Sequence, residues 1–295
     1  MKRIHVAPNN ATHDLPLWVA QQEGLFAAEG IEVEFIAEDK SVNRPVQGEK
    51  LTPVASVVMA GQKETLIETG QAQVFNACEW GCIIRAHSAK SGAKIIQRRP
   101  VVYAHTLLVR GDSPVQLPED LAGRTIGITW PSGNYFMAYR MLEGYLSTDQ
   151  IRVVDMGGRH KNFEGFLAGD VEATVNFEPF TSTAERMGAR AIVEGLDQGE
   201  EVGSPDMDEG TRSGWSRALS KAVERINADP FKYYPMIIDA ELPGRITPQE
   251  VRWQRVRYVP PSPYSRESFE ATYRWMRDHE MIEGDARYED LVFTG

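Results

Sequence analysis

Cysteine is scarce in this sequence. The chain has 295 residues and two cysteines, Cys78 and Cys82, within the segment NACEWGC. A spacing of four places both on one helix face or at a helix start, and neither a CxxC spacing nor a neighbouring histidine cluster accompanies them. We therefore favour two small, buried apolar residues over a redox pair or a metal site, and we expect no disulfide.

The common motifs of metal, nucleotide and cofactor chemistry are missing too. The six histidines are scattered, and no HExxH, P-loop or GxGxxG pattern occurs. Metal hydrolysis, nucleoside triphosphate binding and dinucleotide binding therefore have no support in the sequence. We expect no metal and no cofactor.

Positive charge is in deficit. The chain has 32 Lys and Arg against 42 Asp and Glu, a formal net charge of -10. Nucleic acids and anionic membrane surfaces attract basic patches, so we expect neither as a partner.

Long apolar runs are lacking as well. No run approaches the roughly 20 residues that cross a bilayer, so we expect no membrane insertion. Residues 1–3 are followed at once by a strand candidate, without the apolar core of a signal peptide. We expect a cytoplasmic protein or, alternatively, a periplasmic one given in mature form with an added methionine.

What the chain does have is a regular alternation of helix and strand patterns. Segment 15–35, LPLWVAQQEGLFAAEGIEVEF, combines an apolar helix face, glycines where a helix ends, and a strand in which apolar residues alternate with glutamate. A polar loop at residues 8–14 precedes it. Similar alternation along the chain predicts an α/β fold with mainly parallel sheets flanked by helices.

The element boundaries follow from the same patterns. The expected strands are residues 4–7, 31–35, 73–75, 94–96, 101–109, 124–128, 151–154, 173–176 and 191–193. The expected helices begin at residue 15 and then cover residues 62–69, 80–89, 135–146, 162–167, 180–187, 216–228, 230–238, 248–257 and 266–279.

Four motifs resemble one known family in the order in which they occur. They are segment 15–35, LVRGDSPVQLPEDLAGRTIGI (108–128), FEGFLAGDVEATVNFEPF (163–180) and YSRESFEATYRWMRDHEMIEGDARYEDLVF (264–293). The chain is thereby similar to the periplasmic-binding-protein family that recognises sulfonates, nitrate, taurine and thiamine-pyrimidine precursors, which also includes pyrimidine synthases.

This resemblance implies a two-lobed, type II fold with a ligand cleft between the lobes. Residues 1–105 and 195–295 are expected to form lobe one, and residues 106–194 lobe two. In one respect the chain departs from the family, because residues 194–214 are polar, acidic and glycine-rich where an apolar return strand is usual. We expect a shortened crossover there.

Candidate binding residues follow the strands, because ligands of doubly wound sheets bind beyond the carboxyl ends of the strands. Five loops qualify. Their candidate residues are Asn9, Asn10, His13 and Asp14; Asn76, Glu79 and Trp80; Trp130, Ser132, Gly133 and Asn134; Gly158, Arg159 and His160; and Asn176 and Glu178.

An anionic ligand is favoured by two of these loops. In TWPSGNYF, Ser132 to Asn134 precede a helix, where free N–H groups attract a carboxylate, sulfonate or phosphate. The alternative, simple capping of the helix by Ser132 or Asn134, uses the same geometry. In MGGRHKNF, Arg159 suits bidentate contact with an oxyanion, although the neighbouring polar residues equally fit a solvated loop.

The aromatic and ionisable candidates leave further alternatives open. Trp80 and Trp130 could sandwich a planar ligand, with Phe163 or Phe177 nearby, or each could cover a core. His13 and Asp14 could exchange a proton with a bound acid, whereas helix capping by Asp14 is the favoured interpretation. Glu79 and Glu178 are the other acid-base candidates.

Two functions remain from different classes. The first is capture of a small organic anion or heteroaromatic acid, similar to receptors of ABC importers, with an ABC permease as partner. The second is a cytosolic enzyme such as an aromatic-acid decarboxylase or related lyase, with His13, Glu79 and Arg159 at the reacting group. The chain lacks the cysteine motif of the pyrimidine synthases and the first-loop cysteine of the similar desulfinases, so we favour binding.

Overall fold

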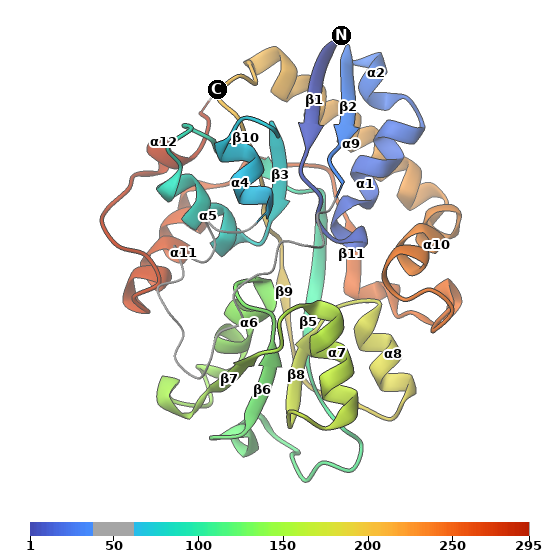
Figure 1. Ribbon diagram of the computed structural model, residues 1–295, viewed down its shortest axis with the longest axis vertical. Helices are drawn as coiled ribbons and strands as arrows, with labels where there is room; N and C mark the ends of the chain where they lie inside the picture. The colour runs from blue at the N-terminus through green and yellow to red at the C-terminus, as the bar shows by residue number, and fades with distance from the viewer. Residues whose placement is uncertain (38–61, 295) are drawn as a thin grey trace.

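Two β-sheets with helices packed around them form the protein (Figure 1). The structure, a computed structural model, describes residues 1–37 and 62–294. The first sheet has the order β2 (Ile31–Phe35), β1 (Lys2–Val6), β3 (Val74–Ala77), β10 (Glu200–Gly203) and β4 (Lys94–Arg98). The second has the order β11 (Val256–Tyr258), β5 (Val101–Val109), β8 (Ala173–Asn176), β6 (Thr125–Ile128) and β7 (Arg152–Asp155), with β9 (Arg190–Asp197) also paired to β5.

Among these strands, β10 in the first sheet and β5 in the second run against their neighbours. The pairs β1–β2, β1–β3, β6–β7 and β6–β8 are parallel, and every pair that includes β10 or β5 is antiparallel. The expected α/β fold is therefore confirmed, but both sheets are mixed rather than mainly parallel, because four of the described strand pairs are parallel and five are antiparallel.

Helices cover both sheets. Around the first lie α1 (Ala11–Gln22), α2 (Leu25–Ala28), α4 (Gln62–Glu68), α5 (Glu79–Ser88), α9 (Glu209–Ala228), α10 (Pro230–Glu241), α11 (Arg266–Asp278) and α12 (Tyr288–Leu291). Around the second lie α6 (Gly133–Leu142), α7 (Arg159–Ala168) and α8 (Phe180–Arg186). The 3₁₀ helices are η1 (Pro118–Leu121), η2 (Thr148–Gln150), η3 (Pro248–Glu250) and η4 (Trp253–Arg255). In the described ranges, none of the helices is long and apolar enough to cross a membrane.

The chain passes directly from a strand of one sheet to a strand of the other at residues 99–100, between β4 and β5, and at residues 198–199, between β9 and β10. These two crossings touch, because the Arg99 N–H donates to the Gly199 carbonyl at 3.0 Å and the Gln198 amide donates to the Arg99 carbonyl at 3.2 Å. A Cβ on Gly199 would lie 1.7 Å from the Ala77 carbonyl oxygen, so only glycine fits there. The lobe boundaries given above stay a prediction.

The expectation of a shortened crossover after residue 194 is wrong. Strand β9 continues to Asp197, and β10 follows with all four residues buried. The segment looked unsuited to a strand because of its carboxylates. Asp197 is held by Arg99 and Tyr103, and Glu201 accepts from the Trp215 indole N–H at 3.1 Å, so polar partners offset part of the cost of burial.

Several element boundaries also differ from the prediction, and two of the differences have a clear physical reason. The expected helix at 248–257 is replaced by η3, η4 and β11, whose residues alternate buried, exposed and buried and pair with Tyr103 to Val101 of β5. Helix α1 begins at Ala11 rather than residue 15, because the Asn10 side chain accepts from the His13 N–H at 3.0 Å and caps it. Residues 11–14 are therefore helical.

Candidate ligand cavity

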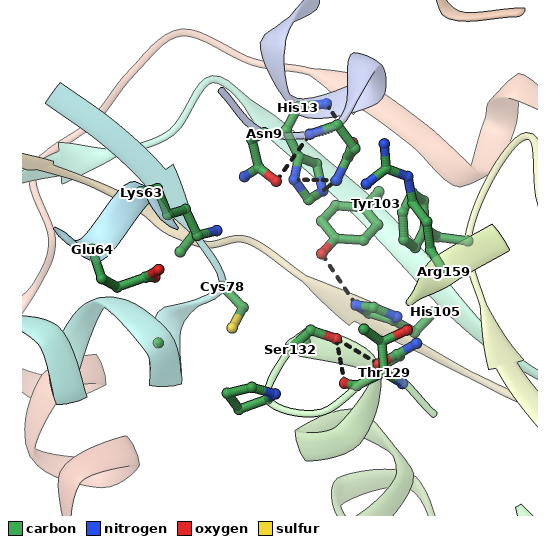
Figure 2. Close-up of a pocket in the computed structure, with 17 residues that line it drawn as sticks. Asn9, His13, Lys63, Glu64, Cys78, Tyr103, His105, Thr129, Ser132 and Arg159 are labelled. Atoms are coloured by element: carbon green, nitrogen blue, oxygen red, sulfur yellow. Dashed lines mark hydrogen bonds between the residues drawn. The ribbon is translucent and has the colours of Figure 1, made fainter. Parts of the chain in front are cut away.

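A cavity of about 120 Å³ lies between the two sheets, where the loops after several strands meet (Figure 2). Its lining residues are Asn9, Asn10, His13, Lys63, Glu64, Ala77, Cys78, Gly81, Tyr103, His105, Thr129, Pro131, Ser132, Gly133, Asn134, Arg159 and Phe177. Both sheets contribute, so the cavity corresponds to the expected cleft.

Asn9 is held in the cavity wall by two buried side chains behind it. Its side-chain amide donates to the backbone and side-chain oxygens of Asn76, at 2.8 and 2.6 Å. Asp14 accepts from the Asn9 N–H and from the Asn76 amide, both at 2.8 Å. Burial raises the pKa of Asp14 to about 6. Asp14 and Asn76, both predicted as ligand contacts, instead orient Asn9.

His13 is a neutral residue of the cavity wall. Its Nδ1 lies 2.8 Å from the Asn10 amide nitrogen and 3.1 Å from Nη1 of Arg99. Arg99 can only donate, so Nδ1 accepts and the ring proton is on Nε2. Burial lowers the pKa of His13 well below its usual value, and the charge of Arg99 lowers it further. Its ring stacks on Phe177 with centroids 5.7 Å apart.

A buried network continues the wall along β5. The Tyr103 hydroxyl donates to Asp197 at 2.8 Å, and Nε2 of His105 lies 3.1 Å from that hydroxyl. Arg99 lies 3.4 Å from the same carboxylate. Burial alone would raise the pKa of Asp197, but hydrogen bonds from His105 and Tyr103 and the charge of Arg99 lower it. A carboxylate is thus kept ionised behind the aromatic side of the cavity.

The N-terminus of α6 faces the cavity from the second sheet. Asn134 accepts from the Thr129 N–H at 3.0 Å and from the Ser132 hydroxyl at 2.5 Å, which closes the loop before the helix. A Cβ on Gly133 would lie 3.0 Å from Nε2 of His105 and 3.3 Å from Cβ of Cys78. The first N–H groups of a helix have no intrahelical partner, so this end offers donors and positive potential to an anion.

Helix α5 begins on the opposite side, with Cys78 at its N-cap. Burial, with a smaller contribution from the charge of Asp197, raises the pKa of the Cys78 thiol to about 12. Cys78 is therefore a small, neutral, buried residue, as expected. It borders the cavity as well as the apolar core.

Arg159 reaches the cavity from the first turn of α7 and carries an ion pair. Its Nε donates to Glu241 at 2.7 Å, and the other carboxylate oxygen of Glu241 accepts from the Ala11 N–H at 2.8 Å. The N-terminus of α1 is therefore already occupied by a carboxylate. Gly158 and His160 do not line the cavity, and the His160 ring nitrogen lies 2.9 Å from the Glu241 carbonyl oxygen.

Of the two alternatives for Trp80 and Trp130, the structure shows core packing, because both rings are packed against other aromatic residues. Trp80 stacks on Phe136 with centroids 5.2 Å apart, and Trp130 lies edge-on to Tyr135 at 4.3 Å. Neither ring lines the cavity, and the core-covering interpretation holds for both. Of the two phenylalanines, Phe177 lines the cavity and Phe163 is in the core.

The acid-base candidates are not brought together either. The Glu79 carboxylate accepts from the hydroxyls of Tyr264 and Thr272 on the α11 side, away from the cavity. Burial raises the pKa of Glu79. Glu178 is buried against Ser182 and Arg255. Asn176 donates to Thr174 within the second sheet. The set of His13, Glu79 and Arg159 expected for an enzyme therefore does not assemble around the cavity.

The sequence interpretation missed several lining residues. Tyr103 and His105 are two apart on β5 and share one face, and a histidine within the apolar strand VVYAHTLLV was the available signal. Lys63 and Glu64 lie on α4, and no feature of their sequence distinguished them from surface residues. Thr129 belonged to the predicted loop but was not selected.

The family comparison agrees with this architecture. The family model described as NMT1/THI5 like matches residues 11–209, and the chain belongs to that family. A search of curated protein sequences finds no match. The predicted family resemblance and the two-lobed periplasmic-binding-protein fold are thereby confirmed.

Solved structures with the same fold include binding proteins and an enzyme. The alkanesulfonate-binding protein SsuA from Xanthomonas axonopodis pv. citri, bound to MOPS, has 16% identity over 99% of this chain and 97% of its own, with a TM-score of 0.73. The periplasmic aliphatic sulphonate binding protein SsuA from Escherichia coli has 10% identity over 100% and 92%, with a TM-score of 0.71. The desulfurization enzyme DSZB has 13% identity over 99% and 96%, with a TM-score of 0.64. At these identities the likeness is one of fold.

Proposed function

We propose that the protein binds a small organic anion in the cavity between its two sheets. The observation that carries this proposal is the convergence of the α6 N-terminus and Arg159 on one cavity, whose wall also includes the neutral ring of His13. The helix end and the guanidinium both favour negative charge. The rings of Tyr103 and Phe177 in the same wall suit an apolar or aromatic body.

The relatives support the same class of ligand. Two of the similar folds are described as sulfonate-binding proteins, one of them with bound MOPS. A sulfonate or carboxylate on a small organic body is therefore the ligand class that we propose. A cofactor-independent lyase is the second candidate, favoured by the similar fold of DSZB and opposed by the position of Glu79.

Thermal-shift screening followed by titration calorimetry tests the proposal. The panel contains aliphatic and aromatic sulfonates, aromatic carboxylates, pyrimidines and the neutral sulfonamide of each sulfonate. A ligand that binds only the native state raises the melting temperature by mass action. We expect sulfonates or carboxylates to stabilise the protein and their neutral analogues to do so less. Equal effects of both would contradict the anion site.

Mass analysis of each hit after incubation separates receptor from enzyme. A ligand recovered unchanged supports the binding function. A ligand that has lost carbon dioxide or its sulfur group would show instead that the protein is a lyase.

Partner and compartment follow as part of the proposal. Since the Escherichia coli relative is described as periplasmic, we propose that this chain acts outside the cytoplasm and delivers its ligand to an ABC permease. Cell fractionation tests this point. Recovery in the cytoplasmic fraction would contradict it and favour the enzyme.

A further inference from the structure

Glu241 connects three helices with one buried carboxylate. It is the last residue of α10, and its side chain is 1% exposed. One carboxylate oxygen accepts from the N–H of Ala11, the first residue of α1, at 2.8 Å. The other accepts from Nε of Arg159, the first residue of α7, at 2.7 Å. Its charge is thus opposed by a helix N-terminus and a guanidinium, which leaves little net repulsion for an anion nearby.

The Arg159 guanidinium uses its Nε–H within the protein and has its other N–H groups available to a ligand. Glu241 holds Nε, and between described residues this is the one hydrogen bond of the Arg159 side chain. A guanidinium has five N–H donors in a fixed plane, so four remain. Arg159 lines the cavity, and its guanidinium lies on the side of His13 (Figure 2).

We propose that Glu241 is a positioning residue of the ligand site, which fixes Arg159 so that its remaining N–H donors face the bound anion. The inference rests on the proposed function. The Arg159 side chain is 30% exposed, so without Glu241 it would sample several rotamers and lose that freedom on binding. The Glu241 carboxylate already orders the Arg159 side chain in the folded protein, so this ordering is not a cost of binding.

The substitution Glu241→Gln tests the proposal in the full chain. The amide keeps the volume and one acceptor for the Ala11 N–H, but loses the charge that holds Arg159. With benzenesulfonate as the probe we expect at least about tenfold weaker binding, the scale of one hydrogen bond to a charged group. Binding of the neutral benzenesulfonamide is expected to stay unchanged. Unchanged or tighter binding of benzenesulfonate would overturn the inference.

A matched control is available on the same helix. Glu164 of α7 forms an ion pair with Arg245, which follows α10, and neither residue lines the cavity. Glu164→Gln removes a neighbouring ion pair and is expected to leave benzenesulfonate binding unchanged. Should Glu164→Gln weaken binding as much as Glu241→Gln, a general loosening of α7 would explain both effects and the specific role would be refuted.

A double-mutant cycle asks whether Glu241 acts through Arg159. Arg159→Gln is expected to lose anion affinity, and Glu241→Gln in that background is expected to add no further loss. An additional loss in the double variant would show an independent role and contradict the proposal. Arg159→Lys keeps the charge but lacks Nε, so its affinity for benzenesulfonate is expected to resemble that of Glu241→Gln. Because Arg159→Lys leaves Glu241 in place, it provides the test if Glu241→Gln fails to fold.

Arginine side-chain NMR tests the positioning without any ligand. In the free protein the Arg159 Nε–H is expected to exchange slowly with water, and this protection should vanish in Glu241→Gln and persist in Glu164→Gln. Fast exchange in the wild type would overturn the inference. A wild type that binds no anion of the panel but protects this N–H would refute the proposed function and leave the positioning intact.

Discussion

Arg99 and Asp197 form a buried ion pair, 3.4 Å long, that joins the two places where the chain passes from one sheet to the other. Arg99 lies in the first crossing, and Asp197 ends β9 immediately before the second. The same two side chains contact His13 and Tyr103 of the cavity wall. The structure that connects the sheets is therefore also the support of the ligand cavity.

His13 is expected to remain neutral, with its proton on Nε2, from pH 5.5 to 8. Burial lowers its pKa well below the usual value, and Arg99 keeps Nδ1 as an acceptor. Long-range nitrogen-proton NMR of the imidazole checks this directly. A ring that becomes doubly protonated near pH 6, or that carries its proton on Nδ1, would contradict the assigned hydrogen bonds.

The substitution Gly133→Ala is expected to reduce the affinity for the ligand by about tenfold or more and to preserve the fold. The added methyl group would lie 3.0 Å from His105 and 3.3 Å from Cys78, so it fills space between the helix end and the opposite wall. Overpacking of this kind also costs about 1–3 kcal/mol of folding stability.

Gly144→Ala is the matched control for Gly133→Ala. Its added methyl would meet nothing within 4 Å, so binding should not change. Calorimetry compares both variants with the wild type. Normal affinity in Gly133→Ala would show that the ligand does not use this end of the cavity.

Glu201 is expected to make the protein less stable as the pH rises from about 4.5 to 7. Burial raises its pKa from 4.5 to about 7, so in this window the folded state holds a proton that the unfolded chain releases. The unfolded state then binds fewer protons, and the free energy of unfolding falls with pH. The rise in the pKa of Glu201 corresponds to about 3 kcal/mol of folding stability. This contribution is fully present below pH 4.5 and is lost above pH 7.

Chemical denaturation of Glu201→Gln from pH 4.5 to 8 measures this contribution. The variant should gain stability relative to the wild type as the pH rises. Glu224→Gln, at an exposed position of α9, serves as control and should follow the wild type. A difference between Glu201→Gln and wild type that does not vary with pH would contradict the raised pKa.

Both cysteines are expected to be unreactive in the native protein. Burial raises the pKa of Cys78 to about 12 and that of Cys82 well above its ordinary value, so at pH 8 almost no thiolate is present. Ellman's reagent should detect two thiols in denaturant and react slowly before unfolding. Rapid native reaction at Cys78 would instead indicate an activated thiol in the cavity and strengthen the enzyme alternative.

Much of the fold could be predicted from the sequence because it depends on local periodicity. Glutamates alternating with apolar residues placed β2, and the pattern around TWPSGNYF predicted the loop that brings Ser132, Gly133 and Asn134 to the cavity. These are statements about neighbours along the chain, which short-range geometry determines.

The missed parts of the site depend on which face of an element meets which partner. Trp80 and Glu79 lie beside Cys78, but their positions on α5 turn them away from the cavity that Cys78 borders. Tyr103 and His105 reach the cavity from the part of β5 that pairs antiparallel with β9, and β11 lies beside Tyr103. Direction and pairing of a strand are long-range properties, which the pattern of one segment does not contain.

Strand β10 lies between β3 and β4, although it follows both by about one hundred residues in the chain. During synthesis, the first sheet therefore cannot close until residue 203 has left the ribosome. Strands β5 to β9 of the second sheet, by contrast, form one uninterrupted stretch that can pair earlier. Each sheet is thus completed by a late strand, the first by β10 and the second by β11, and β3 and β4 wait for a strand encoded beyond the whole of that stretch.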